Sequence, residues 1–251
     1  MTAAFGTGDT LTTSVTSEVY SILDEADEWI TWDPEKEARP LEEQVIPLST
    51  VEEWQRTFEG DPDIEAIVPF QRETLPILNT RTRLNAPSAR IVAFRSQDAA
   101  ALGGLRSLDG EPVALSGREI AINQDLAEEI EAQVGDAVVL FYGGEELEFT
   151  VVALVPSNVL SGAIEPSVAN GATVDFATLA EVTGRGENAN AVIVSNVGGV
   201  KDGMARSDDA MDKLEPLLED TPYEVRPLKK ELIQFAELIG ATFTTAFVVF
   251  G

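Results

Sequence analysis

The sequence predicts an α+β domain that is interrupted by a second, β-rich lobe. Segments with strand and helix patterns alternate before about residue 95 and again after about residue 166. Between them, turn residues separate short runs in which apolar residues alternate, as in paired strands. We therefore expect a first lobe built from both ends of the chain and a second, inserted lobe built from its middle.

The first part of the chain is predicted to begin with a helix and to continue mainly as strands. Leu11, Val15 and Val19 recur every four residues and form one apolar stripe, which favours a helix up to Leu23. Two prolines, Pro69 and Pro76, argue against a helix in the alternating run that contains them. The expected elements are a helix at 10–23, a strand at 26–31, one or two helices at 41–58, an extended segment at 64–78 and a strand at 88–94.

The stretch at 117–156 has the clearest pattern in the chain. Asn123 is a suitable N-cap, and Leu126, Ile130 and Val134 are predicted to share one face of the helix that follows. Gly-Asp and Gly-Gly pairs then mark turns. The expected elements are a strand at 119–122, a helix at 124–132, a Gly135-Asp136 turn, a strand at 138–141, a Gly143-Gly144 hairpin turn and a strand at 147–155.

The last third begins with a segment at 157–171 whose composition predicts a linker. The elements expected after it are a strand at 172–176, a short helix at 177–182, a strand at 189–196, a helix at 202–218 and a strand at 223–226. The side chains predicted to point inward from the helix at 202–218 are Met204, Met211, Leu214 and Leu218. A final helix is expected from Leu228 onward.

The C-terminal tail is the most apolar stretch. Leu238–Gly251 comprises 14 uncharged residues, and a membrane-spanning helix needs about 20. We interpret the tail as the start of a truncated membrane helix, and the small residues of Met1–Gly8 as the last turn of another. The alternative is a C-terminal helix or strand buried in the domain. Lys229 and Lys230 could form an interfacial anchor or simply the polar start of a helix.

The composition limits the partners of the protein. The 251 residues are 44% hydrophobic, enough for a sizeable core, and carry a net charge of −27 with a pI near 4.1. Such a field repels nucleic acid and anionic lipid. The acids are spread along the chain, which favours a solvated surface adapted to high salt. An acidic docking face for a basic partner or for cations is the other interpretation.

The absence of histidine and cysteine from the sequence excludes several kinds of chemistry. Disulfides, thiol chemistry, Ser-His nucleophiles and histidine zinc sites all need one of these residues. The sequence also has no Gly-rich loop followed by Lys-Ser or Lys-Thr, so ATP binding by that route is excluded. No catalytic, cofactor-binding or metal-binding residue is therefore predicted, and the chain is not expected to be an enzyme.

Three weaker candidates for a functional site occur in the sequence. Asp61–Glu65 resembles the start of a calcium loop, but the sixth position is not glycine and the twelfth is Arg72, which cannot ligate. A carboxylate-based hydrolase stays open in principle, although nothing singles out a pair of acids. Trp29, Trp32 and Trp54 could line a ligand groove or, as is more usual for tryptophan, anchor the core.

The segments GREIAINQDLAEEIEAQVGDAVVL and EFTVVALVP resemble the core of the extracytoplasmic domain of MacB/FtsX-type ABC transporter permeases. In that family a strand and a helix lead to a Gly-Asp turn, here Gly135-Asp136, and to strands ending in a run that here covers Phe149–Pro156. The family's glycine in that run is replaced by Ala153. The segments at 173–182 and 191–195 resemble the strand, short helix and strand that follow in the family.

The resemblance implies a two-lobed, MacB-like domain between two membrane helices of a permease. The implied ranges are 1–23 for the end of the first membrane helix and a connecting helix, 24–95 and 166–227 for a Porter-like lobe, 96–165 for an inserted Sabre-like lobe, and 228–251 for the helix leading into the second, truncated membrane helix. It implies a location at the cell membrane, on the extracytoplasmic side.

The resemblance also implies partners and a function. The family pairs with a cytoplasmic ABC ATPase, usually dimerises, and transmits ATP-driven motion to an outer lipoprotein, peptide or cell-wall factor; it needs no cofactor. On this hypothesis the helices at 10–23 and 228–251 lie side by side. The alternative hypothesis is an acidic extracellular binding or adhesion module with no role in transport.

Overall fold

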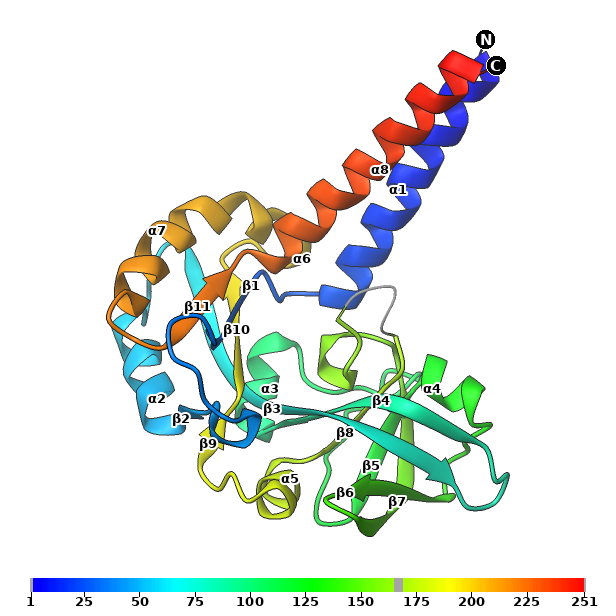
Figure 1. Cartoon of the computed structure of the whole chain (residues 1–251), viewed down its shortest axis with the longest axis vertical. Helices are drawn as coiled ribbons and strands as arrows, with labels where there is room; N and C mark the ends of the chain where they lie inside the picture. The colour runs from blue at the N-terminus through cyan, green and yellow to red at the C-terminus, as the bar shows by residue number, and fades with distance from the viewer. Residues whose placement is uncertain (1, 165–168, 251) are drawn as a thin grey trace.

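The structure is a computed structural model that describes residues 2–164 and 169–250. For residues 2–12, 240–241 and 243–250 it describes the backbone alone. The described chain forms a long helical stalk joined to a mixed α+β body, and the two ends of the chain lie together at the tip of the stalk (Figure 1).

The first half of the chain contains a long helix, two long strands that are sheet neighbours, and several short elements. They are α1 (Thr2–Leu23), β1 (Glu28–Trp32), η1 (Leu41–Glu43), β2 (Ile46–Pro47), α2 (Leu48–Thr57), β3 (Ile64–Asn79), β4 (Asn85–Phe94), α3 (Ser96–Ala99), η2 (Ala100–Leu102), β5 (Glu119–Asn123) and α4 (Gln124–Glu129).

The second half completes the sheet and returns to the stalk. Its elements are β6 (Ala137–Tyr142), β7 (Glu145–Val155), η3 (Val159–Ser161), β8 (Gly171–Asp175), α5 (Phe176–Thr183), β9 (Asn188–Ala189), β10 (Ala191–Asn196), α6 (Gly199–Asp202), η4 (Gly203–Arg206), α7 (Ser207–Leu218), β11 (Tyr223–Arg226) and α8 (Leu228–Phe250). The predicted α+β fold class is confirmed.

One large sheet connects all parts of the body. Its described strands follow the order β11-β1-β10-β3-β4-β8-β5-β7-β6, and β6 also pairs with β3, so the strands from β3 to β6 close into a barrel. The 16-residue β3 makes this possible because its first half pairs with β10 and its second half with β6. The register of β3 shifts at Pro76, which has no N–H to donate to a neighbouring strand.

Apolar side chains fill the barrel and both faces of the flat part of the sheet. Ile77, Ile91 and Ile122 lie in the barrel core. On one face of the flat part, Ile30 and Val192 pack with the side chains of α2 and α7. On the other face, Trp29 and Phe70 pack with the bases of α1 and α8. The sheet therefore lies between the stalk and the pair of helices α2 and α7 (Figure 1).

Several local predictions are confirmed. The Asn123 side chain caps α4 by accepting a hydrogen bond from the Leu126 N–H at 3.0 Å. Gly143 and Gly144 both have positive φ, 59° and 87°, and join β6 to β7 as a two-residue hairpin turn. The helices α1 and α8 lie side by side over their length, as predicted for 10–23 and 228–251 (Figure 1).

Three local predictions are wrong. Helix α4 ends at Glu129 because Glu131 adopts a left-handed conformation and the Ala132 N–H bonds back to the Ala127 carbonyl, so Val134 is 62% exposed. The helix expected at 202–218 is broken into α6, η4 and α7. The described part of the expected linker at 157–171 is not a free linker.

That linker segment packs into the body. Val159, Leu160 and Ala163 are buried in the same core cluster as Trp29 and Phe70. The Ser161 hydroxyl donates to the carbonyl groups of Pro156 and Asn158 and tightens the short η3 turn. Turn-forming residues predicted an irregular backbone correctly, but not its burial.

Among the described residues, no helix is both long enough and apolar enough to cross a membrane. The stalk nevertheless exposes large apolar side chains. Phe235 is 60% exposed, Leu238 63% and Ile239 37%, so the alternative of a buried C-terminal helix is wrong for this part of α8. The tail beyond Ile239 lies almost entirely outside the residues whose side chains are described.

Candidate functional site

The stalk joins the body at two neighbouring strands. Helix α1 leads into β1 through residues 24–27, and β11 leads directly into α8. The strands β1 and β11 are antiparallel partners, with Trp29 opposite Arg226 and Thr31 opposite Glu224. Both stalk helices are thus attached to one edge of one sheet, and a movement of either helix acts on the same pair of strands.

A buried ion pair closes this junction. The Lys229 ammonium lies 2.7 Å from Asp27 Oδ1, and both side chains are fully buried. Lys229 Nζ also donates hydrogen bonds to the carbonyls of Asp24 at 2.7 Å and Val200 at 3.1 Å, so the ammonium has two further polar contacts beside the ion pair. The Asn196 backbone N–H donates to Asp27 Oδ2 at 2.9 Å. One ammonium therefore ties the start of α8 to the residues that follow α1 and to α6.

A second buried carboxyl group lies next to this pair. Glu28 accepts a hydrogen bond from Asn196 Nδ2 at 2.8 Å through Oε1, whereas its Oε2 has no hydrogen-bond partner among the described residues. Burial is the main cause that raises the pKa of Glu28 to about 7. Burial also raises the pKa of Asp27, although Lys229 opposes this shift. The junction thus holds two acids and one base away from water.

Apolar and aromatic contacts surround the ion pair. Val19 and Leu23 of α1 pack with Ile233 of α8 in one core cluster. The Tyr20 hydroxyl donates to the sulfur of Met204 at 3.9 Å, and Lys201 Nζ lies 6.0 Å from the centre of the Tyr20 ring. The base of the stalk therefore contacts α6 and η4 as well as the sheet.

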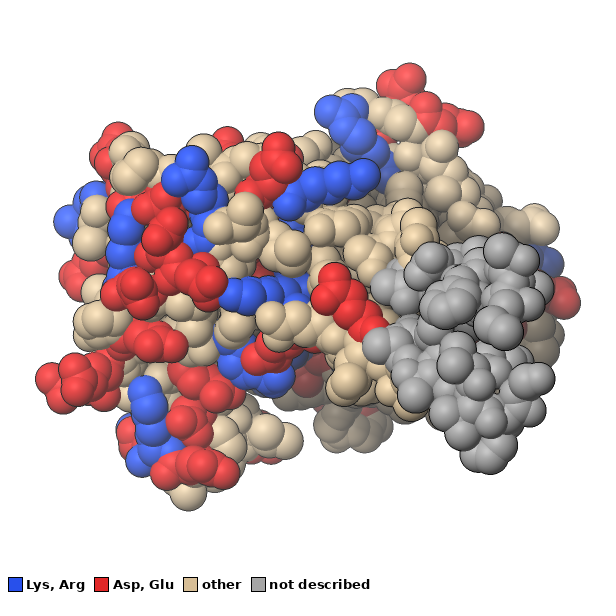
Figure 2. Space-filling view, turned by 90° about the horizontal axis from the view of Figure 1, so that it is seen from above, with Lys and Arg blue, Asp and Glu red and all other residues tan. Residues whose placement is uncertain are grey.

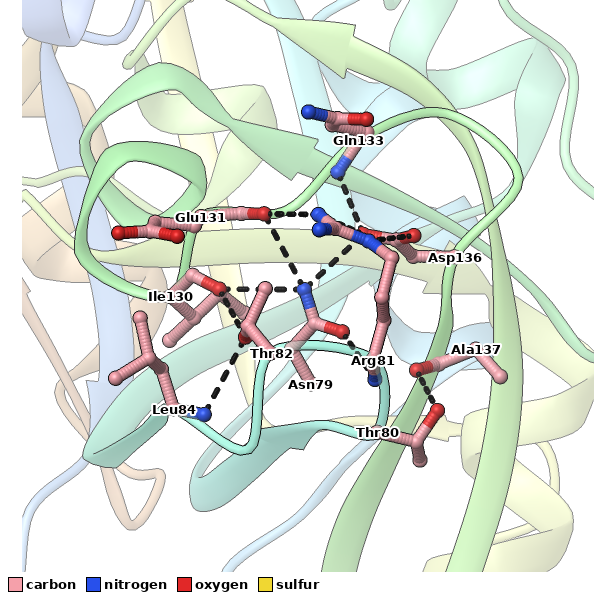
Figure 3. A network of polar contacts seen from close by, with 10 residues as sticks. All are labelled: Asn79, Thr80, Arg81, Thr82, Leu84, Ile130, Glu131, Gln133, Asp136 and Ala137. Carbon is pink, nitrogen blue, oxygen red and sulfur yellow. Dashed lines mark hydrogen bonds and ion pairs between the residues drawn. The ribbon is translucent and has the colours of Figure 1, made fainter.

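The far end of the barrel is fixed by a separate polar network around Asp136 (Figure 3). Its carboxylate accepts from Arg81 Nε at 2.7 Å, Asn79 Nδ2 at 3.0 Å and the Gln133 backbone N–H at 2.9 Å. These donors, Arg81 foremost, lower the pKa of Asp136 to about 2. The Gly135-Asp136 pair of the sequence motif is therefore a structural lock between the β3–β4 turn and the start of β6.

The candidate calcium loop has other partners. Lys213 Nζ lies 2.5 Å from Asp61 Oδ1 and 2.8 Å from Asp63 Oδ2, and Arg206 lies 2.8 Å from Asp63 Oδ1. Among the described residues, no group of three or more acidic side chains is arranged to hold a metal ion. The acids at this turn bind the helix α7 to the start of β3.

The three tryptophans are core residues, as their residue type favours. Trp29, Trp32 and Trp54 are 6%, 7% and 5% exposed. Trp29 stacks edge-on against Phe70 with ring centres 5.2 Å apart, and Trp32 and Trp54 each meet Tyr223 at 5.8 Å. Trp32 and Trp29 nevertheless each line one of two neighbouring cavities.

The junction was not predicted from the sequence. Lys229 does lie in the first turn of a helix, as one of the two interpretations of the sequence has it, but its side chain is fully buried in the ion pair. Lys230 does lie at the surface and pairs with the 84% exposed Asp208 at 2.6 Å. One signal was available, because Asp27 and Glu28 are two adjacent acids at the start of an otherwise apolar strand.

The two acids at the junction are enclosed by the body. Asp27 and Glu28 are acids with raised pKa values, but both are fully buried and no substrate can reach them. The junction connects two antiparallel helices to one sheet through a buried ion pair (Figure 1).

Comparison with known proteins supports a specific fold. No family model matches the sequence, and no curated protein matches it. The periplasmic region of MacB from Actinobacillus actinomycetemcomitans is structurally similar, with a TM-score of 0.52 at 13% identity over 84% of this chain and 92% of that one. The extracellular domain of the noncanonical ABC-type transporter YknZ from Gram-positive bacteria gives 0.49 at 14% identity, over 80% and 99%. The described chain therefore has the α+β fold of the MacB periplasmic region.

Proposed function

We propose that this chain is the extracytoplasmic domain of a MacB/FtsX-type ABC transporter permease and that it works by moving. The observation that carries the proposal is the stalk, whose two helices lie side by side and enter one sheet through a shared, buried ion pair. In such an arrangement the motion of the stalk is passed directly to the sheet, because it is not absorbed by a flexible linker. The fold shared with a MacB periplasmic region supports the same proposal by analogy.

In this proposal the stalk continues into the membrane and the body lies outside it. The exposed apolar side chains Phe235, Leu238 and Ile239 give the stalk a surface suited to lipid or to other membrane helices. The Porter-like lobe is assigned to 24–95 and 166–227, and the inserted Sabre-like lobe to 96–165. A cytoplasmic ABC ATPase drives the motion, and an outer protein, peptide or cell-wall factor is the partner to which the motion is transmitted. A second permease copy completes the assembly.

The location can be tested by cysteine labelling, because the chain has no cysteine of its own. Leu108 and Val134 are 48% and 62% exposed on the body, and Leu108→Cys and Val134→Cys introduce single thiols there. In intact cells that carry the full permease, a membrane-impermeant maleimide should label both. Labelling only after the cells are permeabilised would place the body in the cytoplasm and end the proposal.

The relay can be tested separately at the junction. In the full permease with its ATPase, Lys229→Met should abolish the activity of the outer partner while the ATPase still co-purifies with the permease. The matched control is Lys230→Met, which removes a surface ion pair only. Equal loss in both variants, or full activity in Lys229→Met with a folded body, would contradict a relay through this contact.

A further inference from the structure

Three ionisable side chains are enclosed where the stalk meets the body. Asp27, Glu28 and Lys229 are all fully buried. When all three are ionised, two carboxylates face one ammonium, and one surplus negative charge is left in the interior. The set becomes neutral when one of the two carboxyl groups binds a proton. Because an uncompensated charge is costly away from water, the closed junction favours the form that holds one proton.

The contacts assign this proton to Glu28. Asp27 has a cationic partner and a backbone partner, since its carboxylate lies 2.7 Å from the Lys229 ammonium and accepts from the Asn196 N–H at 2.9 Å. Glu28 accepts from the neutral Asn196 side chain at 2.8 Å through Oε1, and its Oε2 has no hydrogen-bond partner among the described residues. The pKa of Glu28, raised to about 7 mainly by burial, agrees with this assignment.

Within the described part of the chain, the elements packed against Glu28 bring no second positive charge to it. Strand β10 and helix α7 present the neutral side chains of Asn196 and Ser207, and the charge of Lys229 is shared with Asp27. The other acidic or titratable groups around the junction are Tyr20, Asp24, Glu25 and Asp202. The basic groups nearby have partners of their own, which are Tyr20 for Lys201, Asp63 for Arg206 and Asp208 for Lys230.

A short segment of the body covers these groups. We call residues 197–206, which comprise α6 and η4, the cover segment. Its Val200 carbonyl accepts from Lys229 Nζ at 3.1 Å, and a Cβ added to Gly203 would lie 2.7 Å from Asp27 Oδ2, so its backbone rests directly on the ion pair. Helices α6 and η4 have only four residues each. Displacing them breaks fewer backbone hydrogen bonds than displacing a strand of the sheet.

We propose that a proton on Glu28 keeps the cover segment closed over the junction and that loss of this proton releases the segment, so that the pH around the body regulates the contact between stalk and body. The closed, protonated junction is neutral and stays dry. After deprotonation the surplus negative charge is stabilised when water reaches it, and the cover segment is the part that moves to admit water. The role in regulation rests on the relay proposed above, because only a moving stalk gives the contact a function.

Hydrogen exchange on the chain itself tests the proposal. The Asn196 amide reports on opening, because it donates to Asp27 Oδ2 beneath the cover segment. Glu28 holds its proton more tightly in the closed state, with a pKa of about 7 against 4.5, so opening becomes easier as the pH rises between these values. Corrected for the intrinsic exchange rate, the protection factor of this amide should fall about 10- to 100-fold from about pH 5 to about pH 8. Glu28→Gln, which cannot ionise, should abolish the fall, and Glu25→Gln, which removes a half-buried acid of the same junction, should retain it.

A low concentration of urea separates opening of the cover segment from global unfolding. Exchange through a local opening changes little with urea because little surface is exposed, whereas amides of β6 in the barrel lose protection as urea is added. An NMR titration of the Glu28 carboxyl group in the parent protein measures its proton directly, even if Glu28→Gln fails to fold. Equal protection at both pH values, a fall that Glu28→Gln retains or that follows the urea dependence of β6, or a pKa near 4.5 would overturn the proposal. The relay needs the ATPase and these measurements do not, so each proposal can fail alone.

Discussion

Lys229 and Asp27, from opposite ends of the chain, form an ion pair of 2.7 Å in which both side chains are fully buried. Removing one partner of such a pair leaves the other charge without compensation in the protein interior. We expect Lys229→Met to lower the free energy of unfolding by about 3–5 kcal/mol in urea titrations. Lys230→Met should cost less than about 1 kcal/mol, because its ion pair is at the surface. Similar small effects from both variants would show that the buried pair contributes little.

Glu28 should make stability depend on pH. The folded protein holds the proton of this carboxyl group more tightly than the unfolded chain, with a pKa of about 7 against 4.5. Its contribution to the free energy of unfolding is therefore highest below pH 4.5 and falls as the pH rises through about 7. Glu28→Gln cannot ionise and should be more stable than the parent protein at pH 8, by on the order of 2 kcal/mol. Parallel stability curves for the two proteins from pH 5 to about 8 would contradict this.

Asp136 should have the opposite dependence. Its pKa is lowered from 3.8 to about 2, so its contribution to stability is present above pH 3.8 and is lost as the pH falls through about 2. Asp136→Asn keeps the shape of the side chain but weakens the contacts with Arg81 and Asn79, and we expect a loss of about 2–4 kcal/mol at pH 7. Thermal unfolding at several pH values measures both effects. Asp109→Asn, at an exposed turn, is the control and should change neither.

Gly171 is required by space. A Cβ added there would lie 2.2 Å from the Ser161 carbonyl oxygen and 2.9 Å from Gly162 Cα, so β8 and η3 would have to separate. Gly171→Ala should lower stability by about 2–4 kcal/mol. At Gly144 a Cβ meets nothing within 4 Å, and only its φ of 87° opposes a side chain. Gly144→Ala should therefore cost about 1 kcal/mol, and a cost equal to that of Gly171→Ala would contradict the steric explanation.

The net charge of −27 should make the protein sensitive to salt. Acidic and basic side chains are interspersed on the face seen from above, beside the stalk (Figure 2), but acids outnumber bases over the whole chain. Raising potassium chloride from about 0.1 M to about 1 M shortens the screening length from about 10 Å to about 3 Å and weakens repulsion between the acids. The Tm measured by calorimetry should therefore rise. A Tm that stays level or falls would argue against a surface adapted to high salt.

Local features of the fold could be predicted from the sequence, and long-range ones could not. The Asn123 cap, the Gly143-Gly144 turn and the length of β3 depend on residues close together in the chain. The closure of the barrel depends on the pairing of Ile77 with Leu140, for which no neighbouring residue gives a signal. The turn-forming residues at 157–171 predict a linker, because Gly and Pro indicate an irregular backbone but do not indicate whether the segment is buried.

The candidate site was missed for the same reason. Lys229 follows a proline and a leucine and precedes a second lysine, which is the usual pattern at the start of an exposed helix. Its burial is set by Asp27 and by the carbonyl groups of Asp24 and Val200, all distant in sequence. The family resemblance predicted the position of the stalk helices, but gave no information on the contacts at their base.

The additional pairing of β6 with β3 has a consequence for assembly. It leaves the described part of the large sheet with a single edge strand, β11. This strand has four residues, and its last residue, Arg226, is charged. Short charged borders discourage other chains from adding a strand. A partner protein would therefore recognise this body through side chains and helices more readily than through an added strand, which leaves the specificity of recognition open to change by surface substitution without rebuilding the sheet.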